Sequence, residues 1–247
     1  MKINNTNTIH QGPIKTLIFG QSGSGKTSLA KTLPMKTLVI SAEQGLLSLS
    51  GASIDYVDLS VDDEGKSLTA QQRYAKLGEV YKYLLTDEAK KVYQCVFVDS
   101  ITEIAEFVLD VNKAKFPDKA DSFKLWGEYA QNMISMIKLF RDLPHYHVVF
   151  TALEELDKDE SSKRFYGPDI PGSAAKAFLV PALDEVFRLC FSEGKRVLLT
   201  QGSDTLKAKD RSGKLNPVEE PNLDIIFSKI NGTYVVPVKK EKETTTK

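Results

Sequence analysis

A glycine-rich octapeptide near the start of the chain constrains the fold more than any other feature. Residues 20–27 are GQSGSGKT and match the pattern GxxxxGK[ST] in full. The motif follows an apolar, β-rich run at 14–19 and opens a predicted helix at 25–33, which stops before Pro34. Between a strand and a helix, glycines let backbone N–H groups surround a phosphate, and the helix N-terminus adds positive potential. The segment therefore predicts a P-loop for ATP and Mg²⁺.

The predicted phosphate site consists of nine consecutive residues. They are Gly20, Gln21, Ser22, Gly23, Ser24, Gly25, Lys26, Thr27 and Ser28. We expect Lys26, as a solvated point charge, to bridge the β- and γ-phosphates, and the Thr27 hydroxyl to bind Mg²⁺. Asp99 ends the apolar run VFVD, so its carboxylate should emerge at the carboxyl edge of the sheet and hold a Mg²⁺-bound water. The alternative for Asp99 is a cap on the helix that follows.

Composition indicates a folded chain without an overall electrostatic field. The 247 residues are 41% hydrophobic and 27% charged, and 33 basic residues balance 33 acidic ones. Any site for a polyanion must therefore be local. The apolar runs are shorter than the ~20 residues that cross a bilayer, and Cys95 and Cys190 lie in strand-like runs that suit reduced thiols. We expect a cytoplasmic protein with no membrane association and no disulfide, divided into a flexible leader at 1–11, a core at 12–237 and a disordered tail at 238–247.

The order of apolar segments predicts an α/β fold. The expected strands are 37–41, 54–59, 94–98 and 147–151, then a hairpin of 186–191 and 196–200 and a short strand at 206–209; the expected helices are 69–85, 101–114 and 122–143. Because strands alternate with helices in the first part of the chain, the central sheet should be mainly parallel. The segment 154–171 is charged and then rich in glycine and proline, so it is expected to be a long loop.

One further residue indicates which class of P-loop protein this chain resembles. Glu43, in LVISAEQGL, follows the strand after the P-loop helix, and this arrangement resembles the recombinase RecA, whose catalytic glutamate follows the corresponding strand. Further segments with the same resemblance are 12–15, 42–46, 99–103, 171–172 and 207–213. Together they are similar to the phage nucleotide-binding proteins with a RecA-like AAA domain, which include the Sak-type single-strand annealing ATPases. The resemblance covers about residues 12 to 230 and implies a RecA-like P-loop NTPase fold.

The resemblance implies roles for four residues outside the P-loop. Glu43 would act as the general base for the attacking water, with a surface acid as the alternative. Thr151 matches the strand-end sensor of the γ-phosphate, with a buried strand-end hydroxyl as the alternative. Lys209 and Arg211 resemble the basic pair that reaches the ATP site of a neighbouring subunit in a ring or filament. Together with Lys207 they occupy every second position of a strand-like segment, so the three side chains should project from one face. The alternative is that this face is simply solvated.

Two segments correspond by their order to the loops that bind single-stranded DNA in RecA, 112–124 and 154–171. Their candidates for DNA binding are Lys113, Lys115, Lys119, Lys124, Lys163, Arg164, Phe165 and Tyr166. Basic side chains beside aromatic ones suit backbone neutralisation and base stacking. Because acidic residues also crowd the second segment, a solvated charged hairpin is the alternative.

The leading hypothesis is a DNA-stimulated ATPase that anneals or pairs single strands in phage recombination. It implies single-stranded DNA and further copies of the chain as partners, and it leaves room for a single-strand-binding protein. A small-molecule or nucleotide kinase is a second hypothesis, although the chain has no recognisable arginine-rich lid. A nucleotide-gated binding module of the helicase-loader type is the third.

Overall fold

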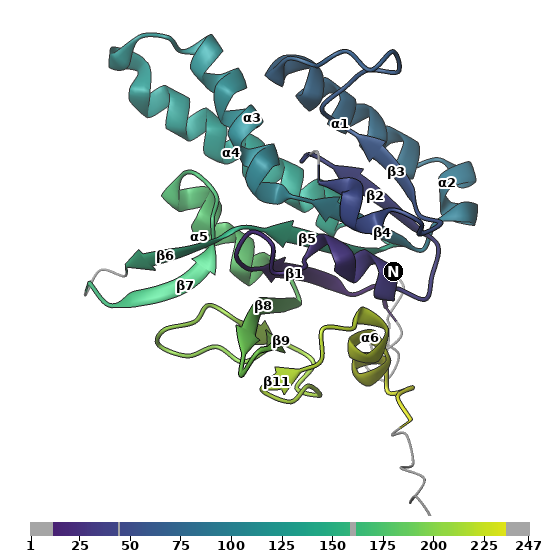
Figure 1. Cartoon of the computed structure of the whole chain (residues 1–247). Coiled ribbons are helices and arrows are strands. Elements are labelled where there is room, and N and C mark those ends of the chain that lie inside the picture. Colours follow the sequence, from purple (N-terminus) through teal and green to yellow (C-terminus); the bar gives the residue numbers. More distant parts are fainter. Residues whose placement is uncertain (1–11, 44, 159–161, 236–247) are drawn as a thin grey trace, which may run out of the picture.

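The computed structural model describes residues 12–43, 45–158 and 162–235 (Figure 1). Its strands are β1 (Lys15–Phe19), β2 (Thr37–Ser41), β3 (Asp55–Asp58), β4 (Cys95–Asp99), β5 (His147–Ala152), β6 (Glu154–Lys158), β7 (Arg164–Pro168), β8 (Glu185–Ser192), β9 (Lys195–Leu199), β10 (Lys209–Asp210) and β11 (Val218–Glu219). Within these residues a nine-stranded sheet has the order β11-β9-β8-β1-β5-β4-β2-β3, with β10 paired to β8. The expected leader at 1–11 and tail at 238–247 lie outside the described residues.

The helices cover both faces of this sheet. They are α1 (Ala70–Leu84), α2 (Asp87–Val92), α3 (Ile101–Lys115), α4 (Ser122–Arg141), α5 (Ser173–Ala182) and α6 (Leu223–Asn231), with 3-10 turns at Thr27–Thr32, Leu46–Leu49 and Lys119–Asp121. In Figure 1, α1, α3 and α4 lie on one side of the sheet and α6 on the other. The sheet is therefore the middle layer of three.

Two hydrophobic clusters, one on each face of the sheet, explain why the central strands are apolar throughout. In β4, Val96 and Val98 join the cluster beneath α1, α3 and α4. Cys95 and Phe97 join the cluster on the opposite face, together with residues of α6 and of the 3-10 turn at Thr27–Thr32. A strand buried on both faces has no polar positions to alternate with, as in CVFVD.

The predicted fold class is confirmed. The strands from β3 to β8 in the sheet order pair in parallel, and β9, β10 and β11 join antiparallel at the C-terminal side. The hairpin of β8 and β9 turns at Glu193 and Gly194, both with positive φ. A mainly parallel sheet flanked by helices, with antiparallel C-terminal strands, is consistent with a RecA-like P-loop NTPase.

Three local predictions were wrong. The helix expected at 25–33 is a shorter 3-10 turn at Thr27–Thr32. Of the strand expected at 206–209 only the last residue is in a strand, the two-residue β10. The long loop expected at 154–171 is mostly the two-stranded sheet of β6 and β7. The charged residues of this segment indicated a loop, but in the structure ion pairs compensate them within a strand. Lys176 of α5, for example, contacts both Glu155 and Asp157 of β6.

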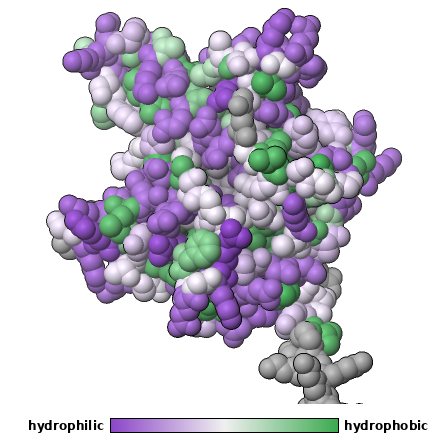
Figure 2. Space-filling view, in the orientation of Figure 1, coloured by the Kyte–Doolittle hydropathy of each residue, from purple (hydrophilic) through white to green (hydrophobic). Residues whose placement is uncertain are grey.

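The surface is largely polar. On the face shown in Figure 2, hydrophilic residues predominate, and hydrophobic residues form small separate groups. Among the described residues, no helix has both the length and the apolar character that crossing a membrane requires.

Candidate active site

The P-loop begins where β1 ends, between β5 and β8. The Gly20 N–H donates to the carbonyl of Ala152 at 3.2 Å. A Cβ atom on Gly20 would lie 2.3 Å from the carbonyl oxygen of Leu189, so any larger residue would push the loop away from β8. Gly25 has a φ of +102°, which strongly favours glycine. The sequence of the loop is thus dictated by close backbone approach and by backbone conformation.

Lys26 is buried rather than solvated, which corrects the sequence-based expectation. Its side chain is folded against the loop, where Nζ donates to the carbonyls of Gly20 at 2.8 Å and Gln21 at 2.9 Å. Burial lowers the pKa of Lys26, and the negative charges of Glu43 and Asp99 oppose that shift. The ammonium group is therefore held at the loop by carbonyl oxygens, close to two acidic side chains.

Asp99 lies at the end of β4 and connects the P-loop to β5. Its carboxylate accepts a hydrogen bond from the Thr27 hydroxyl at 2.6 Å and another from the Thr151 hydroxyl. The cap of α3 is Ser100, whose hydroxyl accepts from the Glu103 N–H at 3.3 Å, so the alternative role of Asp99 as a helix cap is not observed. Thr27, which is partly buried, and the buried residues Thr151 and Asp99 form one polar group at the carboxyl edge of the sheet.

These residues fit a nucleotide phosphate with Mg²⁺. A hydroxyl and a carboxylate oxygen 2.6 Å apart form the kind of oxygen pair that holds Mg²⁺ together with phosphate and water. Thr27 and Asp99 would be the protein groups at the ion. The Ser24 hydroxyl is buried and has no hydrogen-bond partner among the described residues, so it is available to a phosphate oxygen. Bound Mg²⁺ would neutralise charge on the phosphates.

Glu43 lies beside this group because β2 and β4 are paired. Ser41 is opposite Asp99 in the ladder, and the Ala42 N–H donates to the Asp99 carbonyl at 2.7 Å. The Ser100 hydroxyl donates to the Glu43 carboxylate, which fixes its position two residues beyond the strand end. The structure thus brings Glu43 to the site, and its role as the general base remains a prediction.

Sequence reasoning missed an ion pair at the mouth of the P-loop. Arg188 of β8 donates to the Glu154 carboxylate at 2.8 and 3.2 Å, and its guanidinium lies 3.5 Å from the ring centre of Tyr166. Arg188 and Glu154 line a pocket of about 240 Å³, together with 21–24 and 189–191. Glu154 comes soon after the end of β5, at the carboxyl edge where Asp99 also lies. This position in the sequence was the signal that could have placed Glu154 at the site.

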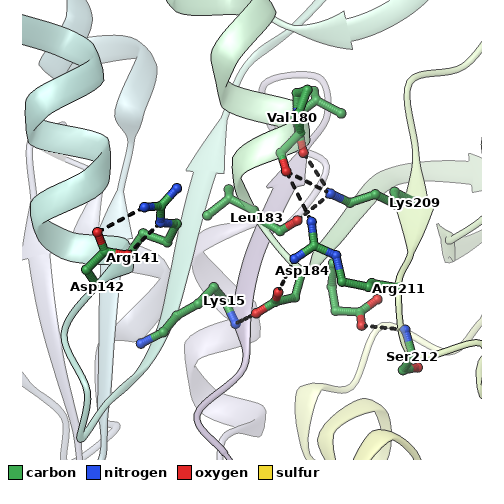
Figure 3. A network of polar contacts seen from close by, with 11 residues as sticks. Lys15, Arg141, Asp142, Val180, Leu183, Asp184, Lys209, Arg211 and Ser212 are labelled. Atoms are coloured by element: carbon green, nitrogen blue, oxygen red, sulfur yellow. Dashed lines mark hydrogen bonds and ion pairs between the residues drawn. The ribbon is translucent and has the colours of Figure 1, made fainter. Parts of the chain in front are cut away.

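The basic pair Lys209 and Arg211 contacts its own chain at the C-terminal end of α5 (Figure 3). Lys209 Nζ donates to the carbonyls of Val180, Pro181 and Leu183. Arg211 forms an ion pair of 2.7 Å with Asp184. Because β10 pairs with the first residues of β8, this pair lies at the sheet edge opposite the P-loop of the same chain. A role in a neighbouring subunit's site would require these contacts to open.

The eight candidates for DNA binding fall in two places. Lys113, Lys115, Lys119 and Lys124 lie between the end of α3 and the first turn of α4, whereas Lys163, Arg164, Phe165 and Tyr166 lie at the start of β7. Within the described residues, four of the lysines have an ion-pair partner: Asp110 for Lys113, Glu128 for Lys115, Asp121 for Lys124 and Asp204 for Lys163. The two rings also have cationic partners, since Lys207 lies over Phe165 and Arg188 over Tyr166.

Comparison with known proteins identifies the family. No curated protein matches the chain significantly. Among solved structures, an ATPase from the type III secretion system of pathogenic bacteria aligns with a TM-score of 0.43 and 16% sequence identity, over 72% of this chain and 52% of that one. This chain therefore spans about half the length of that structure. The family model described as AAA domain matches residues 12–212, which include the P-loop, Glu43, Asp99 and Arg211. The chain belongs to the AAA domain family, and its site is that of a P-loop ATPase.

Proposed function

We propose that this chain is an ATPase that binds single-stranded DNA and anneals or pairs strands in phage recombination. The observation that carries the hydrolytic part is the position of Glu43, which Ser100 holds beside the hydrogen-bonded pair of Asp99 and Thr27. A carboxylate next to a phosphate and Mg²⁺ site is suited to orienting a water for attack on the γ-phosphate. Hydrolysis is therefore favoured over phosphoryl transfer to a small molecule.

Two projecting segments support the DNA-binding part of the proposal. In Figure 1, the connection between α3 and α4 and the hairpin of β6 and β7 both extend toward the left side of the molecule. Near the first lie Phe123, which is 91% exposed, and Trp126, which is 43% exposed. Exposed rings at the start of α4, a few residues after Lys119, suit stacking of unpaired bases and neutralisation of the backbone. The two segments would form one surface for a single strand.

The ion pairs of the lysines favour a second candidate, a nucleotide-gated module of the helicase-loader type. Lys113, Lys115 and Lys124 each contact a carboxylate of the same chain, and such pairs reduce the charge offered to phosphates. Exposed aromatic residues suit a protein partner as well as bases. In this alternative, a protein would stimulate turnover more than DNA does.

Further parts of the proposal follow from the resemblance to RecA-like proteins. The chain would self-associate into a ring or filament, with Lys209 and Arg211 acting at a neighbouring ATP site. It would use ATP with Mg²⁺, work in the cytoplasm of the phage host and cooperate with a single-strand-binding protein. Assembly would make hydrolysis depend on protein concentration.

The test is Mg-ATP turnover with and without single-stranded DNA, with duplex DNA for comparison and size analysis in each state. We expect phosphate release that single-stranded DNA increases, and larger assemblies with ATP and DNA together. Lys26→Ala should show neither binding nor turnover, because the phosphates lose their cation. Turnover that ignores DNA would favour the loader-type module, and transfer of phosphate to an added acceptor would favour a kinase.

A further inference from the structure

The hairpin of β8 and β9 extends beyond the end of the P-loop strand. The last pair between β1 and β8 joins Phe19 to Arg188, whereas β8 continues to Ser192 before the chain turns. The extension lies directly beside the loop, since a Cβ atom on Gly20 would meet the carbonyl of Leu189 at 2.3 Å. The tip of the hairpin therefore borders the phosphate site.

An aromatic ring and a cation occupy this part of the hairpin. Phe191 and Arg196 are directly opposite in the antiparallel ladder, and the guanidinium lies 5.3 Å from the ring centre. A Cβ atom on Gly25 would be 3.3 Å from Nε of Arg196, which places the arginine against the P-loop. Phe191 is 61% exposed, and Arg196 has no ion pair in the part of the chain that the structure describes. Packing and pairing thus leave both groups available to a ligand.

The direction of a bound nucleotide follows from the sheet order. Asp99 of β4 and Glu43 after β2 lie on one side of β1, beyond β5, and β8 with β9 lies on the other side. Mg²⁺ and the attacking water belong to the γ-phosphate end of the triphosphate. When that end points toward Asp99, the α-phosphate, ribose and base extend toward the hairpin. The pocket of about 240 Å³ between 21–24 and 188–191 opens there.

We propose that the hairpin of β8 and β9 forms the nucleoside end of this site. Phe191 stacks on the base, and Arg196 contacts the α-phosphate side of the triphosphate. The inference rests on the proposed nucleotide binding and adds which residues recognise the nucleoside. Stacking uses the π-face that every base has, and the polar side chains Glu154 and Arg188 in the pocket are bonded to each other. The ligand class is therefore nucleoside triphosphates, with little distinction between one base and another.

The first experiment compares the affinities of Mg-ATP and Mg-tripolyphosphate, measured by calorimetry. Phe191→Ala should weaken ATP by about 5- to 100-fold, the range expected for removal of one base stack, and should leave tripolyphosphate unchanged because that ligand has no base. Phe191→Tyr should keep the wild-type affinities. Tyr56→Ala is the matched control, because this aromatic residue is 59% exposed and belongs to β3, at the far end of the sheet order. It should affect neither ligand.

The second experiment tests the arginine. Arg196→Ala should weaken ATP and tripolyphosphate alike, since both present phosphate to the guanidinium. Lys195→Ala is its control, because adjacent strand residues point to opposite faces, and it should change neither affinity. Mg-GTP should bind the wild type within a few fold of Mg-ATP.

The outcomes separate this inference from the proposed nucleotide site. If the wild type binds neither ligand, or if Lys26→Ala binds both like the wild type, the P-loop proposal itself is wrong. If the wild type binds both and Phe191→Ala binds ATP normally, or loses both ligands equally, stacking on Phe191 is excluded. Equal loss in the Lys195 and Arg196 variants would reduce the arginine to part of a general surface charge.

Discussion

Arg196 and the pair of Lys209 and Arg211, basic side chains in the last third of the chain, lie in opposite environments. Arg196 lies against the P-loop, and the described residues offer it no carboxylate. Lys209 and Arg211, by contrast, are held by the carbonyls that end α5 and by Asp184. The end of a helix exposes carbonyl oxygens and negative potential, which attract cations. A basic residue in a strand pattern is therefore not a functional cation until its neighbours are known.

The two ends of strand β8 determine where these basic side chains lie. Its first residues, Glu185 and Val186, pair with β10 at the edge of the sheet that faces away from the P-loop. Its last residues pair with β9 and carry Phe191 and Arg196 past the phosphate loop. The same strand thus places Phe191 and Arg196 beside the P-loop and Lys209 and Arg211 at the opposite edge of the sheet.

We expect the largest effect, a loss of turnover, when the pair of Lys209 and Arg211 is removed. Lys209→Ala combined with Arg211→Ala should keep ATP binding and lose DNA-stimulated turnover, by about 10³- to 10⁵-fold if the pair acts at a neighbouring site. The loss corresponds to roughly 4–7 kcal/mol of barrier. Phosphate release at saturating ATP and DNA measures it.

Because these residues also bind α5, stability must be measured beside turnover. We expect the free energy of unfolding to fall by roughly 1–3 kcal/mol, since the double variant removes hydrogen bonds of charged groups. Mixing the double variant with Lys26→Ala should partly restore activity, as an intact ATP site then meets an intact basic pair. Wild-type turnover in the double variant, or activity per subunit that is constant down to the monomer, would leave the pair a purely structural role.

The next effect concerns the predicted general base. Glu43→Gln should bind Mg-ATP normally and hydrolyse it about 10²- to 10⁴-fold more slowly, because an amide cannot accept the proton of the attacking water. Single-turnover hydrolysis measures the step directly. Glu79→Gln, an exposed change on α1, is the matched control. Unchanged hydrolysis in Glu43→Gln would return this carboxylate to the surface-acid alternative.

A smaller effect is expected at the β6 and β7 hairpin. Replacing Lys163 and Arg164 by glutamine should weaken binding of single-stranded DNA about 10- to 100-fold. It should also reduce the slope of log affinity against log salt by about one unit for each phosphate that the variant no longer neutralises. Titrations at several salt concentrations measure both. Lys66→Gln is a control at an exposed lysine that, like Lys163, is paired with an acid. An unaltered slope would favour the solvated hairpin.

The sequence was sufficient where one chain segment determines the structure. The P-loop could be predicted because backbone approach at Gly20 and backbone conformation at Gly25 leave no other residue. The central strands could be predicted because burial on both faces makes them continuous apolar runs. The long helices could be predicted because burial of one helical stripe imposes a period. The position of Asp99 could be predicted because polar residues that end parallel strands gather at one edge of the sheet.

The sequence was insufficient where partners come from distant segments. Glu154 and Arg188 are 34 positions apart and meet only because β5 and β8 flank β1. The strands β6 and β7 were missed because ion pairs to α5 compensate charges that looked like a loop. Arg196 gave no sign of its position, since its contact with the P-loop depends on the length of the β8 extension.

The smallest expected effect tests the sheet edge that carries the basic pair. Glu185, 1% exposed, accepts a hydrogen bond from the Ser212 N–H and has one buried oxygen without a partner among the described residues. Burial, together with the nearby charge of Asp210, raises its pKa to about 8. Between about pH 4.5 and 8 the folded chain keeps a proton that the unfolded chain has released, so stability should fall as pH rises through this range.

Glu185→Gln should remove this dependence, because the amide resembles the protonated acid in shape and does not ionise. The variant should be more stable than the wild type at pH 8 and nearly equal to it at pH 4.5. Burial also lowers the pKa of His147 to about 4, which favours stability at rising pH in both proteins, so only the difference between them reports Glu185. Denaturant unfolding at several pH values measures that difference. A difference that is constant from pH 4.5 to 8 would show that Glu185 does not titrate in this range.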